Sequence, residues 1–161
     1  MRNDLLERFP YEECDSIIQK LGLHQNYPVW PTSLYELLNV EVCCMSLPSW
    51  VKAFSIKQVG IEHSIVVLDE KLSNLDVRHA IFHEAGHLLA HRSGRPHACA
   101  THGRVSREEV EADLIGAYLS APAWAVKELF YQGYNTQQVA ATLEITTEML
   151  ELRYQLLTYN K

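Results

Sequence analysis

Residues 73–91 read SNLDVRHAIFHEAGHLLAH, and the rest of the chain is best interpreted outward from them. They begin with the pattern S-x-x-D, from Ser73 to Asp76, which is typical of the first turn of a helix. A helical pattern follows, and Ser93-Gly94 supplies a natural end for it. The sequence therefore predicts one long helix, and residues 83–87 place the motif H-E-x-x-H inside it.

This motif predicts a metal site. At a spacing of four residues the imidazoles of His83 and His87 lie on one face of a helix and can bind a single metal ion. Glu84 directly follows the first of them, so its carboxylate lies beside the metal. There it can take a proton from a water on the metal and deliver it to a leaving amine, which is the chemistry of a zinc hydrolase.

Four histidines of this helix, His79, His83, His87 and His91, are spaced four apart and give three candidate metal-binding pairs. Only the central pair, His83 and His87, has a glutamate directly after its first histidine. A metal bound by either of the other two pairs would have no such base beside it. We therefore interpret His79 and His91 as flanking residues. His91 is a candidate for lining the cleft, with a structural hydrogen-bonded role as the alternative, and His79 is interpreted as structural.

A catalytic zinc site needs a third protein ligand, and residues 109–113 (EVEAD) supply the candidates. Glu109 and Asp113 share one helix face, so one can bind the metal while the other orients a ligating imidazole. The same face continues with small residues that would let this helix approach the first one closely: Ala112, Gly116, Ala117 and Ser120. The alternative for Glu109 is structural, because it also completes an S-x-x-E capping box that begins at Ser106.

The remaining patterns predict an α+β fold, which is mainly helical with a small three-stranded antiparallel sheet packed beside the H-E-x-x-H helix. The strands are expected from three β-prone runs, at residues 40–45, 50–57 and 61–68. A loop with His97, Cys99 and His102 is expected after the metal motif. Further helices are expected at residues 10–21, from 31 onward, and at 106–120, 124–132, 136–143 and 147–159.

Composition excludes several classes of function. The chain has 161 residues with 14 Lys+Arg against 20 Asp+Glu, a net charge of −6, which argues against a broad surface for nucleic acid or anionic lipid. There is no apolar run of membrane-spanning length and no apolar segment near the N-terminus that would suit a secretory signal. We therefore expect a cytoplasmic protein with no membrane partner. The four cysteines form no C-x-x-C pair and are interpreted as reduced thiols.

The segments HEAGHLLAH and EVEADLIGAYLSAP, together with the order of predicted elements, resemble the ImmA/IrrE family of metallo-endopeptidases. The resemblance implies that His83, His87 and Glu109 bind the metal, as in gluzincins, with Glu84 as general base. It implies Zn²⁺ as the cofactor, with Mn²⁺ as the alternative. It also implies a protein substrate, namely a helix-turn-helix transcriptional repressor. We expect residues 1–133 to form the zincin-like core and residues 134–161 a helical segment packed on the same domain.

Two other functions stay open. Residues 136–143 and 147–159, joined by three residues, have the spacing of a helix-turn-helix, so a DNA-binding regulator is the first alternative. Residues 134–161 carry two basic side chains against three acidic ones, a net charge of −1, which favours packing or repressor docking over DNA binding. The second alternative is a non-catalytic metal-binding interaction module, in which Glu84→Gln would change no activity.

Overall fold

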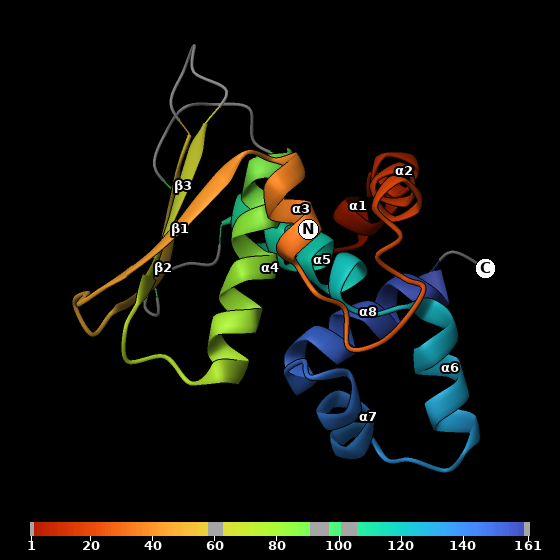
Figure 1. The fold of residues 1–161 in the computed structure, drawn as a ribbon. Coiled ribbons are helices and arrows are strands. Elements are labelled where there is room, and N and C mark those ends of the chain that lie inside the picture. Colours follow the sequence, from red (N-terminus) through yellow and green to blue (C-terminus); the bar gives the residue numbers. More distant parts are fainter. Residues whose placement is uncertain (1, 58–62, 91–96, 101–105, 160–161) are drawn as a thin grey trace.

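The computed structural model describes residues 2–57, 63–90, 97–100 and 106–159. In Figure 1 a twisted sheet lies on one side of the helix α4, and most of the other helices lie on its opposite side. The strands are β1 (Val40–Met45), β2 (Val51–Lys57), β3 (Ser64–Asp69) and β4 (His97–Ala100). The helices are α1 (Arg2–Glu7), α2 (Tyr11–Leu21), α3 (Thr32–Leu37), α4 (Asn74–Ala90), α5 (Arg107–Ser120), α6 (Ala123–Tyr131), α7 (Thr136–Leu143) and α8 (Thr147–Tyr159).

The sheet confirms the α+β class but corrects the predicted three-stranded antiparallel arrangement. Its strand order is β1-β3-β2-β4, with β1 parallel to β3 and the other two pairs antiparallel. β3 takes an inner position and is well buried, with Val66 and Leu68 at 0% and 1% exposure, whereas β1 is mostly exposed and lies at an edge. β4 occupies part of the expected loop and pairs with the other side of β2, which would otherwise be an open edge.

Several helix boundaries follow the predicted capping signals. The Ser73 hydroxyl accepts a hydrogen bond from the backbone N–H of Asp76 at 3.2 Å, directly before α4. Gly22 ends α2 with a φ of 63°, in the left-handed region that favours glycine. The predicted bounds of α7 and α8 are confirmed. The expected end of α4 at Ser93 and Gly94 lies outside the described residues, which follow this helix to Ala90.

The helices α4 and α5 cross with their backbones in contact, as the small residues on α5 predicted. A methyl group added at Gly86 of α4 would collide with backbone atoms of Ala112, and one added at Gly116 of α5 would lie 2.9 Å from the carbonyl oxygen of Phe82. Only glycine allows so close an approach at these two points. Because the backbones are this close, the side chains of Glu109 and Asp113, on either side of Ala112 in α5, can reach the histidines of α4.

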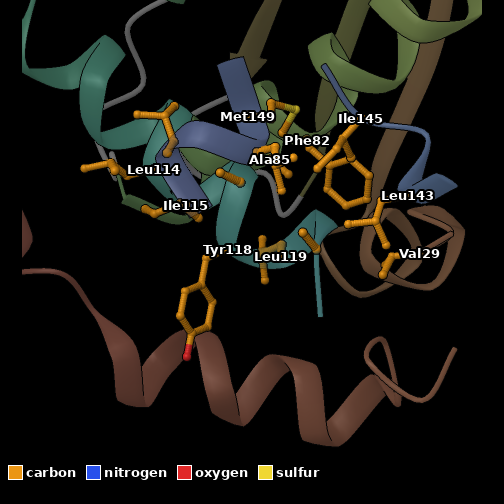
Figure 2. Packing of buried hydrophobic residues seen from close by; sticks show 14 of the residues in the cluster. Val29, Phe82, Ala85, Leu114, Ile115, Tyr118, Leu119, Leu143, Ile145 and Met149 are labelled. Carbon is orange, nitrogen blue, oxygen red and sulfur yellow. The ribbon is translucent and has the colours of Figure 1, made fainter. Parts of the chain in front are cut away.

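The hydrophobic core lies on the other faces of these two helices. Figure 2 shows Leu114, Ile115, Tyr118 and Leu119 of α5 turned into it, as the sequence predicted. Figure 2 also shows residues of α4, of α7 and α8 and of the turn between them in the same cluster: Phe82, Ala85, Leu143, Ile145 and Met149. The C-terminal helix pair is therefore part of the same core as the metal-motif helix. No helix in the described part of the chain combines the length and the apolar character needed to span a bilayer.

Candidate metal centre

The two motif histidines lie one turn apart on the buried face of α4. Their rings are 4.7 Å apart between centroids and nearly perpendicular, and their Nε2 atoms are 3.1 Å apart. Both side chains are almost fully buried. Two imidazole nitrogens this close, pointing at the same space, are the arrangement that the four-residue spacing in a helix predicts.

Glu109 reaches the same point from the first turn of α5. Its two carboxylate oxygens lie 3.3 Å from the Nε2 atoms of His83 and His87, one oxygen to each ring. Burial alone would raise the pKa of Glu109, but hydrogen bonds and charge from the two histidines outweigh it and lower the pKa to about 2. The carboxylate is therefore ionised across the pH range in which proteins work.

The serine half of the predicted capping box is present at this helix start, and it uses the backbone of Glu109. The hydroxyl of Ser106 accepts a hydrogen bond from the backbone N–H of Glu109 at 3.2 Å. Because the backbone makes the cap, the Glu109 side chain is left to face the histidines. The Glu109 side chain therefore lies where the ligand hypothesis places it, and the cap of α5 comes from Ser106.

Asp113 lies one turn further along α5, behind His83. Its Oδ1 atom is 2.6 Å from Nδ1 of His83, a short hydrogen bond in which the ring N–H donates to the carboxylate. Burial raises the pKa of Asp113, but hydrogen bonds from His79 and His83 outweigh it and hold that pKa well below its usual range. With its Nδ1 proton directed at Asp113, His83 presents the lone pair of Nε2 to the space shared with His87 and Glu109.

Glu84 is completely buried, and neither of its carboxylate oxygens has a hydrogen-bond partner in the described part of the chain. Burial raises the pKa of this carboxyl, although the neighbouring His83 and the hydroxyl of Ser55 lower it in part. A carboxylate buried without a well-formed hydrogen bond destabilises a fold. The position of Glu84 beside the two histidines therefore calls for a reason other than stability.

The donor atoms fit a divalent transition metal. One nitrogen from His83, one from His87 and one oxygen from Glu109 all lie within 4.8 Å of one another. Two imidazoles and one carboxylate are a donor set that zinc and its neighbours bind, and three protein ligands leave a coordination position for water or substrate. The donor atoms of a second group, His79, His83 and Asp113, also lie within 4.8 Å of one another.

The other residues singled out from the sequence divide into two groups. His91 and His102 lie outside the described residues. The contacts of His79 with Asp113 and with Thr146 were not foreseen. No local sequence pattern predicts the contact between His79 and Thr146, because the two residues are 67 positions apart in the chain.

A family model described as the IrrE N-terminal-like domain, which is a peptidase family, matches residues 36–155. The chain belongs to this family. The resemblance drawn from the two motifs is therefore confirmed. The match to the IrrE N-terminal-like family spans both helices that carry the candidate ligands, and it continues through α7 into α8. Membership places the chain among metallopeptidases, which act on proteins or peptides. A search of curated proteins gave no match.

Proposed function

We propose that this chain is a zinc-dependent endopeptidase that cleaves a helix-turn-helix transcriptional repressor. The observation that carries the proposal is the meeting of His83, His87 and Glu109, with their donor atoms within 4.8 Å of one another and the buried carboxylate of Glu84 next to them. Family membership supports the peptidase activity. The resemblance to ImmA/IrrE proteins supports the choice of a repressor as substrate.

In the proposed mechanism, His83 and His87 hold the metal through Nε2, and Glu109 holds it through a carboxylate oxygen. When bound, the metal supplies a Lewis acid that polarises the scissile carbonyl and lowers the pKa of water. Glu84 accepts a proton from the attacking water on a carboxylate oxygen and returns it to the nitrogen of the leaving amine. Asp113 keeps the Nδ1–H of His83 fixed, so that the Nε2 lone pair stays directed at the metal.

The first test is metal content. Wild type, Glu109→Ala and Glu108→Ala are purified side by side, treated with a mild chelator, and analysed by mass spectrometry for bound metal. We expect about one zinc ion per wild-type chain and the same for Glu108→Ala, whose side chain is exposed on the same helical turn. Glu109→Ala should lose the metal, because only two protein ligands remain. Manganese in place of zinc would correct the choice of metal and leave the mechanism unchanged.

The second test is cleavage. Candidate helix-turn-helix repressors are incubated with the zinc-loaded chain, and fragments are identified by mass spectrometry. Glu84→Gln should keep the metal and lose cleavage, because the amide cannot accept the proton of the water. Retained cleavage in this variant would refute the mechanism. An absence of metal in the wild type would leave Ser106 and Glu109 as a helix cap and would favour the DNA-binding alternative.

A further inference from the structure

The turn between α7 and α8 contacts α4 one helical turn before the metal motif. Arg78 of α4 donates a hydrogen bond from Nε to the carbonyl oxygen of Glu144 at 2.9 Å, and its guanidinium also lies 3.7 Å from the Glu144 carboxylate. Ile145, the next residue of the turn, is 3% exposed and belongs to the core. The turn is thus fixed to the same helix that carries the candidate metal ligands.

His79 extends this contact toward the metal centre. Its Nδ1 atom is 3.3 Å from the hydroxyl oxygen of Thr146, the last residue of the turn. Its Nε2 atom is 3.7 Å from Oδ1 of Asp113, the same oxygen that lies 2.6 Å from Nδ1 of His83. Thr146, His79, Asp113 and His83 therefore form a continuous polar chain from the start of α8 to a metal ligand.

The hydrogen-bonding roles along this chain are mutually consistent. The Thr146 oxygen already accepts a hydrogen bond from the backbone N–H of Met149 at 3.2 Å, so Thr146 can donate its own proton, to Nδ1 of His79 or to the carboxylate of Glu148. A neutral His79 that accepts at Nδ1 carries its proton on Nε2, which faces Asp113. Asp113 then accepts the 2.6 Å hydrogen bond from His83 and faces the Nε2–H of His79 at 3.7 Å on the same oxygen, so its side chain lies between the two imidazoles.

We propose that His79 is a positioning residue that holds Asp113 against the metal ligand His83 and couples metal affinity to docking of the α7–α8 turn on α4. The proposal rests on the metallopeptidase function proposed above. Its physical basis is that a carboxylate behind a ligating histidine fixes the ring, and that loss of such a partner weakens metal binding. His79 acts one step further out, on the carboxylate itself.

Zinc affinity of the full-length chain, measured by competition with a chromophoric chelator, tests the first half of the proposal. We expect Asp113→Ala to bind zinc about 10- to 100-fold more weakly than wild type, and His79→Leu to fall at about the lower limit of that range. Because His79 acts through Asp113, the double variant should bind no more weakly than Asp113→Ala alone. His63→Leu is the matched control. It removes a histidine that pairs with a carboxylate, Glu41, at 3.5 Å and lies outside the polar chain, so its affinity should equal that of wild type.

Variants in the turn test the second half. Thr146→Val removes the hydroxyl that contacts His79 and should weaken zinc binding, whereas Thr146→Ser keeps the hydroxyl and should restore it. Thr146 also caps α8, so a control must remove a cap from the same helix pair without touching the polar chain. Asn135→Ala does this, because Asn135 caps α7 through the N–H of Gln138 at 2.9 Å. It should leave zinc affinity unchanged.

The outcomes separate this proposal from the proposed function. Equal zinc affinity in wild type and His79→Leu would overturn the positioning role and leave the peptidase mechanism intact. Losses that add up in the double variant would overturn the coupling through Asp113. Two zinc ions per wild-type chain, with one lost in His79→Leu, would show that His79 binds a metal directly. This result would overturn the positioning role. No zinc in the wild type would overturn both proposals.

Discussion

The variant Gly86→Ala tests how the close approach of α4 and α5 supports the metal centre. The added methyl group would lie 2.8 Å from Cα and 2.9 Å from the carbonyl carbon of Ala112. These are backbone atoms that no side-chain rotation can move. The helix α5 must therefore shift away from α4 and carry Glu109 and Asp113 with it.

Two opposing effects set the magnitude. Alanine is favoured over glycine inside a helix by about 1 kcal/mol. Overpacking a tight contact costs typically about 1–3 kcal/mol and occasionally more, and a collision with backbone belongs at the upper end. We therefore expect the free energy of unfolding of the metal-free protein to fall by about 2 kcal/mol. For a domain of this size this corresponds to a melting temperature about 4–8 °C lower.

Thermal unfolding followed by circular dichroism, without metal and with added zinc, measures both consequences. Gly116→Ala serves as the graded comparison. Its methyl group would lie 2.9–3.2 Å from backbone atoms of Phe82 and His83, so its loss of stability should be smaller. Zinc should raise the melting temperature of Gly86→Ala less than that of wild type, because the shift of α5 displaces a ligand. A metal-free Gly86→Ala protein that is more stable than wild type would refute the argument.

Three further predictions concern other residues. Burial lowers the pKa of His24 to about 4 from 6.5, so the unfolded chain binds the proton first as the pH falls, and stability is lost from pH 6.5 downward through 4. We expect about 2 kcal/mol of this loss between pH 7 and pH 5, and its absence in His24→Gln, by urea unfolding at both pH values. Tyr118→Phe removes a 2.6 Å hydrogen bond to Asp15 and should lower the free energy of unfolding by about 1–3 kcal/mol in the same assay. Asn135→Ala should lower it by about 1 kcal/mol through loss of the α7 cap.

Most helices could be predicted closely because their signals are local, although α1 (Arg2–Glu7) was not predicted. Ser73 and Ser106 each accept a hydrogen bond from a backbone N–H three residues later, and Gly22 adopts the left-handed conformation that ends a helix. The sheet could be predicted only in part. Strand propensity identifies a strand but not its neighbour, and the parallel pairing of β1 with β3 and the addition of β4 depend on contacts between distant segments.

In the candidate site, too, the features set by local sequence could be predicted, and those set by contacts between distant segments could not. The spacing of His83 and His87 places them together in any α-helix, and the small residues of α5 indicated that Glu109 and Asp113 could approach them. The contact of His79 with Thr146 depends instead on how the C-terminal helix pair packs on α4. The sequence interpretation of His79 as a structural residue did not include this contact, because periodicity within one helix says nothing about what packs on it.

This packing also bears on the DNA-binding alternative. In a helix-turn-helix the N-terminal residues of the second helix contact base edges in the major groove, so that end must be free. Here the N-terminal turn of α8 is engaged. Thr146 is hydrogen-bonded to His79, and Met149 and Leu150 are buried in the core. DNA binding by α8 would require this turn to leave α4, exposing apolar side chains and breaking the polar chain to His83. The same three-residue turn that suggests a DNA-binding motif in the sequence thus acts, in the folded chain, as a contact that supports the metal-motif helix.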